Sequence, residues 1–554
     1  MLDSFALDVP ARLEDHDRTL QPSRKADLGQ RAPATSDRDH SVTARDDGEV
    51  SCMADARCDR VLDPLVRVDS VLAGENADRR ASSFLRTASR SSHHLAKPAR
   101  DDRAAALGEQ AADLFCSSLV LGAAADDRDL HGAMVERRRA RGGTLVLGGG
   151  FAGSYVARLL GRRGSTIVSL ENFMLFTPLL PEAASGTLEP RHVVVPLRIM
   201  CPSAELLLGR LTGLDHERRA ATVETAAGTF EISYEEAVVA LGSVTRVLPI
   251  PGLAEHALGF KDLADAIHLR NHVLRRLEAA IAATDRHQAE AHLTFVFVGA
   301  GYAGVEALAE LADLVRDALR HYPGLPRHRS RWILVDAAPK ILPEIPSRLG
   351  DYAARQLTKR GVEIRTSTTL ESAGPGAVVL SGGERIASHT LVWTAGVSPT
   401  PLLAKLGVPL DENGRLRVDS RLQVEERERL WALGDCARVP NEATPGVPDP
   451  PTSQHALRQA RRLAKNLGGK PKPYRYRSLG QVATLGRHKG IALVFGLPLR
   501  GFIGWFVTRT YHLYQLPLLS RKLRVVTDWS VALFFRRDIA ELGMLGHPTR
   551  LGDD

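Results

Sequence analysis

The chain has 554 residues, which is long enough for three or more domains of ordinary size, each with a buried core. With 44% hydrophobic and 25% charged residues, the composition is that of a globular protein and excludes a fibrous chain or one disordered throughout. The net charge of +8 suits an anionic partner, but its sign alone does not choose between nucleic acid and a membrane surface. Because the sequence holds no uncharged apolar run of about 18 residues and residues 1–30 lack an apolar signal core, we predict neither a transmembrane helix nor a secretory signal.

The N-terminal segment differs in character from the rest of the chain. Residues 1 to about 138 are rich in Arg, Asp, Ser and Ala and show little sustained apolar periodicity, so we predict a disordered extension over 1–138. At Met134 a basic lead-in, MVERRRARGG, precedes the first strand pattern, TLVLGGG. We expect the first 133 residues to be a dispensable extension or part of an over-long reading frame. The alternative is a genuine tail with a regulatory role.

The first glycine fingerprint follows directly. The stretch LGGGFAGS ends an apolar strand and opens the helical pattern SYVARLLGRRG, and the next strand, TIVSLE, ends at Glu171. Gly148 suits a tight turn, Gly150 a close backbone approach to a pyrophosphate, and Gly153 a close packing of the helix on its strand. A carboxylate at the position of Glu171 can accept hydrogen bonds from the ribose hydroxyls of an adenosine. This is the pattern of a dinucleotide-binding βαβ unit.

A second fingerprint, GAGYAGVE, follows the strand LTFVFV about 150 residues later. Gly299, Gly301 and Gly304 repeat the three glycine roles, and Asp336 ends the next strand, WILVD. Because a carboxylate there repels the 2′-phosphate of NADP and no arginine follows at once, we expect NADH to be preferred. Glycine turns that only pack a helix on a sheet are the alternative for both motifs.

Further short strands surround these units. The segment ATVETAAGTFEISYEEAVVALG lies between the two units, and LVWTAGVSP and RLWALGDCARVP follow the second. Residues 487–545 are rich in aromatic residues and arginine and have the periodicity of helices. The strand end LWALGDCA delivers Gly434 and Asp435, a pair that binds the ribityl and phosphate part of FAD in flavoproteins with two dinucleotide domains. An Asp that caps a helix is the alternative.

These patterns predict an α/β fold in which one Rossmann-like domain is inserted into another. The expected boundaries are 139–262 and 391–486 for the two parts of the outer nucleotide-binding domain, 263–390 for the inserted nucleotide-binding domain and 487–554 for a C-terminal region.

A family resemblance now becomes specific. The text NFMLFTPLLPEAASGTLEPRHVVVPLR, the links VVALGS and VWTAGVSP, the GDCA turn, PPTSQHALRQ and the C-terminal tail together resemble a type II NADH dehydrogenase over roughly 142–545. This family is the single-subunit, FAD-dependent NADH:quinone oxidoreductase that does not pump protons. The resemblance implies FAD in the outer pieces, NADH in the inserted unit and a quinone reached from the membrane side. It also places the loop from Thr177 to Gly186 around the isoalloxazine ring.

The resemblance also assigns a role to Glu306, which we expect in the first turn of the helix behind the second glycine turn. The matching glutamate of the family is implicated in catalysis at the stack of nicotinamide and flavin. A carboxylate there could orient the nicotinamide through its carboxamide. A glutamate favoured near a helix N-terminus by the macrodipole is the alternative.

At the quinone site the sequence departs from the family. The usual pattern is AQxAxQ, whereas this chain reads SQHALRQ, so that Gln454 is kept and Arg458 replaces the second glutamine. Gln454 and Arg458 could both hydrogen-bond a quinone carbonyl, although solvated side chains on a plain helix turn are the alternative. The electron acceptor is therefore less determined than the donor.

The five cysteines, at 52, 58, 116, 201 and 436, form no CxxC pair and no metal-ligand spacing, so we expect reduced thiols, a reducing compartment and no metal site. A flavin disulfide reductase needs a close cysteine pair near the flavin, and a sulfide:quinone reductase needs suitably placed thiols. The sequence has no such pair, and we interpret Cys436 as a small packing residue.

The C-terminal text predicts helices that lie in a membrane interface. In GFIGWFVTRTYHLYQLPLLSRKLRVVTDWSVALFFRRD, apolar and aromatic residues recur every three or four positions, at Phe502, Trp505, Phe506 and Leu513. Basic residues are interleaved with them, and we expect these to snorkel to anionic lipid: Arg500, Arg509, Arg521, Lys522, Arg524, Arg536 and Arg537. Helices packed on their own protein or on a second copy are the alternative, and both can hold at once.

We therefore expect an FAD enzyme that oxidises NADH and reduces a membrane quinone at the inner face of the cytoplasmic membrane, as a peripheral protein that acts as a monomer or a homodimer. Nucleic-acid binding is not expected, because no recognition motif supports it. The alternatives are an NADH-dependent reductase with another acceptor and a flavin-based redox-sensing or interaction protein.

Overall fold

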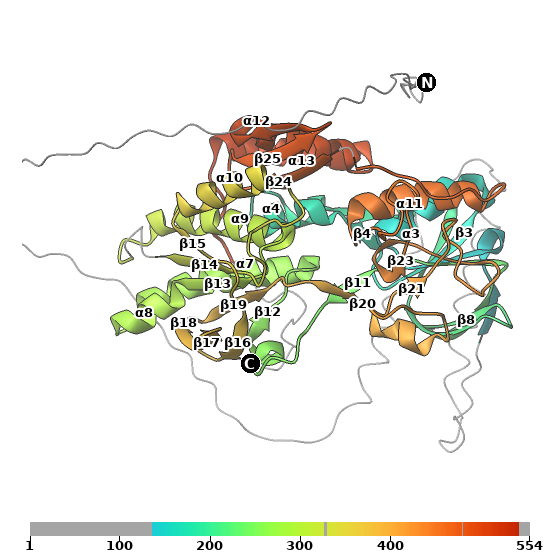
Figure 1. Ribbon diagram of the computed structural model, residues 1–554, viewed down its shortest axis with the longest axis horizontal. Coiled ribbons are helices and arrows are strands. Elements are labelled where there is room, and N and C mark those ends of the chain that lie inside the picture. The colour runs from blue at the N-terminus through green and yellow to red at the C-terminus, as the bar shows by residue number, and fades with distance from the viewer. Residues whose placement is uncertain (1–135, 326–329, 479, 542–554) are drawn as a thin grey trace, which may run out of the picture. The chain divides into compact units, whose positions relative to one another are not determined.

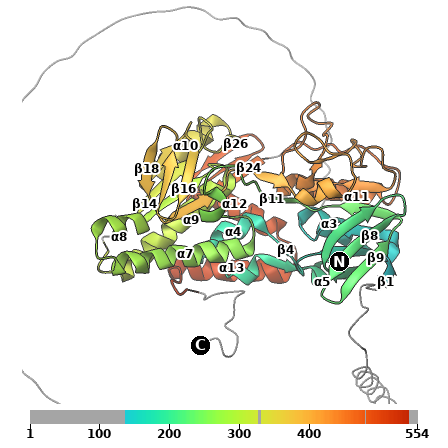
Figure 2. The same cartoon turned by 90° about the horizontal axis from the view of Figure 1, so that it is seen from below.

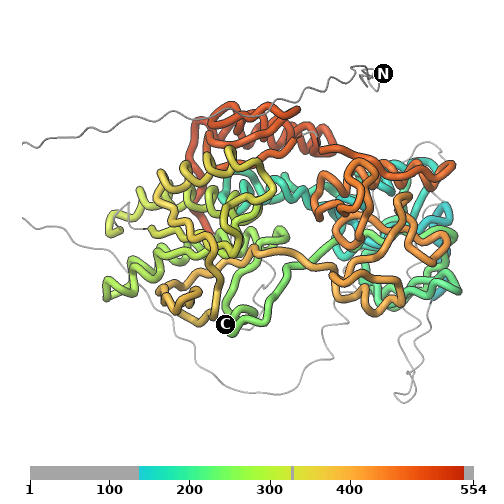
Figure 3. The backbone as a smooth tube through the Cα atoms, in the orientation of Figure 1, coloured from blue at the N-terminus to red at the C-terminus, as the bar shows by residue number. Residues whose placement is uncertain are grey.

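The computed structural model describes residues 136–541 except 326–329 and 479, and these residues belong to one compact unit. Residues 1–135 of the predicted disordered extension lie outside the described residues, whereas its last three residues, 136–138, belong to strand β1 (Glu136–Arg139), so the predicted boundary at 138 was wrong. Two parallel sheets dominate the architecture, and the chain passes from the first to the second and back again (Figures 1 and 3). The fold is therefore the predicted α/β arrangement of two Rossmann-like units, one inserted into the other.

The first sheet has the strand order β22-β10-β2-β3-β6, and all four neighbouring pairs are parallel. Its strands are β2 (Thr144–Leu147), β3 (Ser165–Ser169), β6 (Ala204–Leu208), β10 (Glu236–Val239) and β22 (Leu430–Ala432). Strand β22 comes from a part of the chain nearly two hundred residues after β10, so the inserted unit lies between two neighbouring strands of this sheet. The strands β2, β3 and β22 are fully buried because helices and loops cover both faces.

A mixed sheet, β1-β9-β8-β7, accompanies the first unit, with β1 parallel to β9 and the other two pairs antiparallel. Its strands are β1 (Glu136–Arg139), β7 (Arg210–Asp215), β8 (Ala220–Thr225) and β9 (Gly228–Ser233), and the pair β4 (Phe173–Leu175) and β5 (Val194–Pro196) lies nearby in the chain. In β9 buried and more exposed side chains alternate along the strand, as expected for a sheet with one covered face. These strands match the short alternating pattern predicted between the two fingerprints.

The second sheet has the order β12-β19-β13-β14-β15 and is also parallel. Its strands are β12 (Ala257–Leu258), β13 (Thr294–Val298), β14 (Arg331–Val335), β15 (Val362–Arg365) and β19 (Thr390–Trp393). A small antiparallel sheet follows β15, with strands β16 (Leu370–Gly374), β17 (Ala377–Leu380) and β18 (Glu384–Ala387). The antiparallel strands β11 (Ser243–Thr245) and β20 (Val397–Pro399) pair where the chain enters and leaves this unit (Figure 1).

Helices cover both sheets and separate two main cores. In the first unit α3 (Phe151–Leu160) packs on α11 (Ser453–Asn466). In the second the helices are α7 (Leu263–Ala282), α8 (Arg286–His292), α9 (Tyr302–Ala318) and α10 (Ser347–Thr358). The short helix α4 (Leu180–Ala184) belongs to the first unit by sequence but packs on α7 and α9 of the second. This helix, which lies within the predicted flavin loop, therefore joins the two units (Figure 2).

The C-terminal region is not entirely helical, contrary to our prediction. It begins with a three-stranded antiparallel sheet, β24 (Gly480–Thr484), β25 (Gly490–Val494) and β26 (Leu497–Arg500), before α12 (Gly501–Gln515) and α13 (Leu519–Phe534). Glycines end or begin these strands, and Gly490 has no room for a side chain because a Cβ there would lie 2.7 Å from the Trp505 backbone. Among the described residues no helix is long and apolar enough to cross a bilayer.

Two of the arginines that we expected at the lipid surface point into the protein instead. Arg509 on α12 pairs with Glu182 at 2.9 Å, and Arg537 after α13 pairs with Glu310 at 2.7 Å. Trp505 is also buried, whereas Phe502 and Phe506 are 60% and 58% exposed. The prediction of snorkelling was wrong for Arg509 and Arg537, because buried carboxylates of α4 and α9 provide a closer partner than lipid does. The helix face predicted from periodicity thus splits into a buried side and an exposed side.

Candidate active site

The first glycine turn has the geometry that its sequence predicts. Gly148 has φ +115, and a Cβ there would lie 2.2 Å from the Ala240 carbonyl oxygen. A Cβ on Gly153 would lie 1.9 Å from the Gly148 carbonyl oxygen, so the helix can approach its strand only through glycine. Gly150 has nothing within 4 Å of an added Cβ, and no side chain caps α3. The free N–H groups of α3 thus face open space beside Gly150, which is where a pyrophosphate would lie.

Two acidic residues flank this turn. Glu171 is exposed two residues after β3 ends, and within the described residues its carboxylate bonds to no side chain. Asp435 follows Gly434, which has φ +76, in the short 3-10 turn η7 (Gly434–Cys436). Ser243 Oγ donates to Asp435 Oδ2 at 2.7 Å, and Lys261 Nζ donates to Ser243 Oγ at 2.9 Å.

Sequence reasoning missed Ser243 and Lys261, which lie in the links between the two units. Burial lowers the pKa of Lys261, and the nearby Asp435 carboxylate opposes that shift. A lone serine and a lone lysine in linker text carry no pattern that identifies them, so only the fold brings them to Asp435. They hold the carboxylate in place at the edge of the first site. Thr177 begins the 3-10 turn η3 (Thr177–Leu179), which leads directly into α4.

The second glycine turn repeats the first. Gly299 has φ +110, and a Cβ on Gly304 would lie 1.9 Å from the Gly299 carbonyl oxygen. A Cβ on Gly301 would meet nothing within 4 Å, and no side chain caps α9. Asp336 accepts hydrogen bonds from Ala300 N at 2.5 Å and from Ala338 N at 2.7 Å. Its carboxylate thus braces the glycine turn, a role that we did not predict, while it keeps lone pairs for a ribose hydroxyl.

Glu306 is buried and lies in the second turn of α9, one turn later than predicted, because the helix begins at Tyr302. Its Oε1 accepts hydrogen bonds from Thr484 N at 2.7 Å and from Thr484 Oγ1 at 3.2 Å. Burial raises the pKa of Glu306 to about 8, although the bonds from Thr484 oppose the shift. Because both bonds end on Oε1, Oε2 is the oxygen that would carry the proton near neutral pH. The side chain is therefore not a solvated residue at a helix N-terminus.

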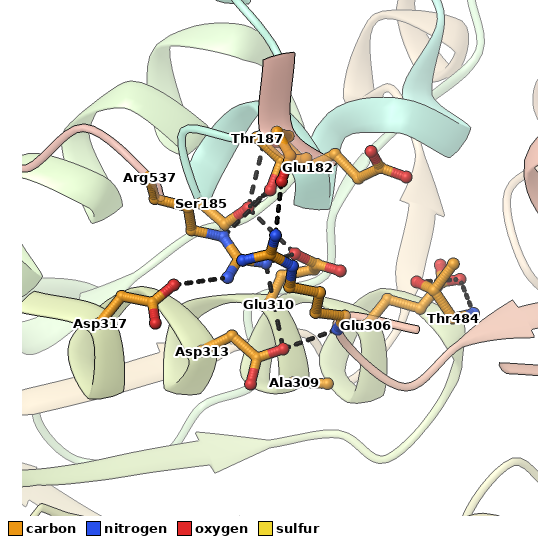
Figure 4. A network of polar contacts seen from close by, with 12 residues as sticks. Glu182, Ser185, Thr187, Glu306, Ala309, Glu310, Asp313, Asp317, Thr484 and Arg537 are labelled. Atoms are coloured by element: carbon orange, nitrogen blue, oxygen red, sulfur yellow. Dashed lines mark hydrogen bonds and ion pairs between the residues drawn. The ribbon is translucent and has the colours of Figure 1, made fainter. Parts of the chain in front are cut away.

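Three more acids on the same face of α9 form a buried charge network with the C-terminal segment (Figure 4). Glu310, Asp313 and Asp317 follow Glu306 at helical spacing, and the side chains of Glu310 and Asp313 are each 1% exposed. Arg537 reaches Glu310 Oε2 at 2.7 Å and Asp317 Oδ2 at 3.3 Å, and Arg360 reaches Asp313 Oδ1 at 2.5 Å. The network connects the helix of the second glycine turn to the residues that follow α13.

A second buried cluster lies on α4. Glu182 accepts hydrogen bonds from Arg509 Nη2 at 2.9 Å and from Trp529 Nε1 at 2.6 Å. The Arg509 guanidinium lies between two indole rings, 4.3 Å from the centroid of Trp505 and 4.7 Å from that of Trp529. Burial raises the pKa of Glu182, and Arg509 opposes this. These contacts fix α12 and α13 against α4, which lies within the predicted flavin loop.

A cavity of about 270 Å³ lies beside this cluster. Its walls come from the segment after α4, from α12 and α13 and from the residues after α13, and they combine the rings of Trp505 and Trp529 with apolar side chains such as Leu188 and Val531. Five arginines also line the cavity: Arg270, Arg487, Arg509, Arg536 and Arg537. The lining therefore combines aromatic and apolar surface with several guanidinium groups, which suits an amphipathic ring.

The predicted acceptor residues lie in the first two turns of α11. Thr452 caps this helix through His455 N, and a Cβ on Gly434 would lie 3.8 Å from the Ala456 Cβ, so the first turn of α11 adjoins the Gly434 turn. Gln454 Nε2 donates to Tyr476 Oη at 2.9 Å, and the Arg458 guanidinium lies 5.3 Å from the centroid of the same ring. Both predicted residues thus meet at Tyr476, which we did not predict.

The two body cysteines are buried. Burial raises the pKa of Cys201 and of Cys436 to about 11, so both are unreactive thiols at neutral pH. Cys436 lies in the Gly434 turn within the first hydrophobic core, and its Sγ donates to the carbonyl oxygens of Val239 and Leu433, as expected for a packing residue. No group of three or more potential metal ligands occurs within the described part of the chain.

Comparison with known proteins agrees with this geometry. Residues 143–460 match the family described as pyridine nucleotide-disulphide oxidoreductase. A probable NADH dehydrogenase of Dictyostelium discoideum is 32% identical over 68% of this chain and 85% of its own length. The type II NADH:quinone oxidoreductase Ndh of Mycobacterium tuberculosis is 30% identical over 71% of this chain and 88% of its own.

Solved structures share the fold. NDH2 of Plasmodium falciparum, solved in complex with NADH, superposes with a TM-score of 0.67 at 18% identity and covers 73% of this chain and 99% of its own. The two nucleotide turns, the Gly434 turn and the sequence relatives agree with one another. The chain belongs to the pyridine nucleotide-disulphide oxidoreductase family and, within it, to the type II NADH:quinone oxidoreductases.

Proposed function

We propose that the protein oxidises NADH and passes two electrons to a membrane quinone through FAD, without pumping protons. The observation that carries this proposal is the pair of uncapped helix N-termini, α3 and α9, each behind a glycine with positive φ, in one compact unit. Two such turns suit two dinucleotides that exchange electrons. Relatives named as NADH:quinone oxidoreductases support the choice of donor and acceptor.

The residues of the first unit fit FAD. Gly150 leaves the space that a pyrophosphate needs, Glu171 has a free carboxylate for an adenosine ribose, and Asp435 is held beside the Gly434 turn for a ribityl or phosphate group. When bound, the flavin supplies the chemistry, because it can accept a hydride from NADH and release electrons to a quinone. Thr177 and the residues up to Gly186 would enclose its ring.

The residues of the second unit fit NADH. Gly301 leaves open space at the start of α9, and Asp336 places a carboxylate where a 2′-phosphate would be repelled. Glu306 is buried one turn further along, and its raised pKa leaves Oε2 able to donate a hydrogen bond at neutral pH. We assign to it the positioning of the nicotinamide carboxamide.

The acceptor side lies at α11 and at the cavity behind α12. Gln454 and Arg458 present polar groups close to the Gly434 turn, and the cavity beside Arg509 offers aromatic and apolar walls to a ring that arrives from a membrane. We infer that the quinone enters there.

The exposed face of the C-terminal region supports peripheral membrane binding. Large apolar side chains gather at the tip between β25 and β26 and on α12 and α13, with Phe495 80% exposed and Phe534 83% exposed. Arg521, Lys522 and Arg524 lie on the same helix as part of this set, as suits an anionic leaflet. We propose docking to the inner face of the cytoplasmic membrane. The same apolar surface could form a homodimer contact.

The first experiment is an anaerobic titration of the purified protein with NADH and then NADPH, read at the flavin band near roughly 450 nm, followed by a quinone analogue. We expect rapid bleaching by NADH, slower bleaching by NADPH and recolouring by quinone. Bleaching without recolouring would point to another acceptor, a possibility that the Arg458 replacement raises. A colourless protein that FAD does not reconstitute would refute the proposal.

A further inference from the structure

The acceptor side holds one residue whose placement neither the motif nor the family match explains. Tyr476 lies in the extended segment before β24, is half-buried, and meets the first turn of α11. Gln454 Nε2 donates to Tyr476 Oη at 2.9 Å. The amide that the sequence pattern assigns to the acceptor is therefore engaged by a phenol.

Four contacts fix the position of Tyr476. Its backbone N–H donates to Asn441 Oδ1 at 3.0 Å, and Asn441 Nδ2 donates to its carbonyl oxygen at 2.8 Å. The Arg458 guanidinium lies 5.3 Å from the centroid of the ring, and the centroid of the His455 ring lies 5.5 Å from it with the two ring planes at 82°. Backbone, ring and hydroxyl are thus all held, which is the preorganisation that a binding group needs.

The supports of Tyr476 are themselves anchored. Asn441 Nδ2 also donates to Asp449 Oδ1 at 2.9 Å, and His455 Nδ1 lies 2.5 Å from Asp449 Oδ2. Gln459 Nε2 donates to the same carboxylate at 3.1 Å, while Gln459 Oε1 accepts from Gly434 N at 2.8 Å. A continuous set of hydrogen bonds therefore connects the supports of the Tyr476 side chain to the turn that we assign to the flavin.

The direction of the Gln454 bond decides what Tyr476 can do. An amide N–H can only donate, so the phenol oxygen accepts from Gln454 and keeps its own proton free. Within the described residues this hydroxyl donates to no other group, and the side chain is not fully buried. A free, oriented O–H donor beside the flavin turn matches a ligand that offers a carbonyl oxygen.

We propose that Tyr476 donates its hydroxyl hydrogen bond to a ring carbonyl oxygen of the quinone, and that Gln454 acts as a positioning residue that orients this hydroxyl. The inference rests on the proposed function and refines its acceptor site. It also accounts for the loss of the second glutamine, because Arg458 packs on the phenol ring rather than replacing the lost amide as a direct ligand.

The test compares the two half-reactions in the Tyr476→Phe holoenzyme by rapid mixing. NADH first reduces the flavin, and the reduced enzyme is then mixed with a short-chain ubiquinone or with ferricyanide, which accepts electrons without a hydrogen bond at a ring carbonyl. A matched control is Tyr322→Phe, which removes a phenol hydroxyl that donates to Glu278 at 2.7 Å in the second unit. Binding of the quinone to the oxidised enzyme, followed by quenching of intrinsic fluorescence, gives a readout independent of turnover.

We expect Tyr476→Phe to slow reoxidation by quinone about five- to tenfold and to weaken quinone binding by a similar factor, as one hydrogen bond between neutral groups predicts. Reduction by NADH and reoxidation by ferricyanide should not change. Gln454→Met should cause a smaller loss, and Gln454→Met combined with Tyr476→Phe should be no worse than Tyr476→Phe alone.

An unchanged quinone rate in Tyr476→Phe would overturn the inference, and so would an equal loss with quinone and ferricyanide, which indicates a structural role. The wild-type enzyme separates this failure from that of the proposed function. If its NADH-reduced flavin is not reoxidised by any quinone, the proposed function itself fails.

Discussion

Arg537 should be worth several kcal/mol of stability, because it neutralises carboxylates that have lost almost all contact with water. Its side chain is 5% exposed, and its guanidinium reaches Glu310 and Asp317 while its Nε donates to Thr187 Oγ1 at 3.0 Å. Asp313, in contrast, keeps Arg360 at 2.5 Å if Arg537 is removed. An Arg537→Met variant thus leaves Glu310 and Asp317 as the buried acids without a cation.

Removing one partner of a buried ion pair typically costs about 3–5 kcal/mol, because the remaining charge stays desolvated. The described part of the chain has roughly 400 residues, and an unfolding entropy of about 2.1 cal/mol/K per residue gives about 0.8 kcal/mol/K. The expected fall in melting temperature is therefore about 4–6 °C. Thermal unfolding at neutral pH, followed by circular dichroism and by the release of flavin fluorescence, measures it.

Arg536→Met is the matched control, since Arg536 is the preceding residue, is exposed, and forms no ion pair within the described residues. It should shift the melting temperature by about 1 °C or less. The double variant Arg537→Met with Glu310→Gln should recover about half of the loss, because one of the two unpaired buried charges is then gone while Asp317 remains. If Arg537→Met melts like Arg536→Met, the network does not hold the C-terminal segment in place and the reasoning is wrong.

Three further results are expected. Because burial raises the pKa of Glu306 to about 8, the protonated side chain stabilises the folded state fully below the ordinary carboxyl range, and this stability is lost as the pH rises towards 8, by at most about 1.4 kcal/mol per pH unit. Glu306→Gln should therefore flatten the fall in melting temperature between pH 5 and pH 8, and an unchanged slope would contradict the assignment. Gly153→Ala should reduce the FAD content of the purified protein at least tenfold, since its Cβ would lie 1.9 Å from a backbone oxygen. Gly161→Ala should lower only the stability, because its Cβ would meet nothing within 4 Å although its φ is +54, and the absorbance of bound flavin distinguishes the two variants. Replacing Phe495 and Phe506 together by Ser should weaken binding to anionic vesicles at least tenfold in a co-sedimentation assay without lowering activity towards ferricyanide, and equal sedimentation of variant and wild type would argue against membrane docking.

Much of the nucleotide-binding architecture follows from local pattern. Gly148 and Gly299 need positive φ, and Gly153 and Gly304 need the absence of a Cβ, so their spacing after an apolar strand reports the turn directly. The position of Asp435 directly after a buried strand also depends only on neighbouring residues. These features can be predicted because each depends on a few consecutive residues.

The details of the acceptor side could not be predicted in the same way. Periodicity identified α12 as amphipathic, but it assigned Trp505 and Arg509 to lipid although both are buried. Likewise, nothing in the linker text marks Lys261, and nothing near α11 in sequence marks Tyr476 as its partner. Each of these contacts joins residues that lie far apart in the chain or in a segment without regular structure.

Two dinucleotide units, one inserted in the other, and the family resemblance could be predicted from the chain alone, because strand periods, glycine spacing and motifs are properties of neighbouring residues. The positions of the polar and charged side chains became known only from the fold: Glu306 is buried against Thr484, Arg537 crosses to α9, and Gln454 reaches Tyr476. The state of a charged or polar side chain depends on which groups surround it once water has been removed, and long-range packing alone sets those surroundings.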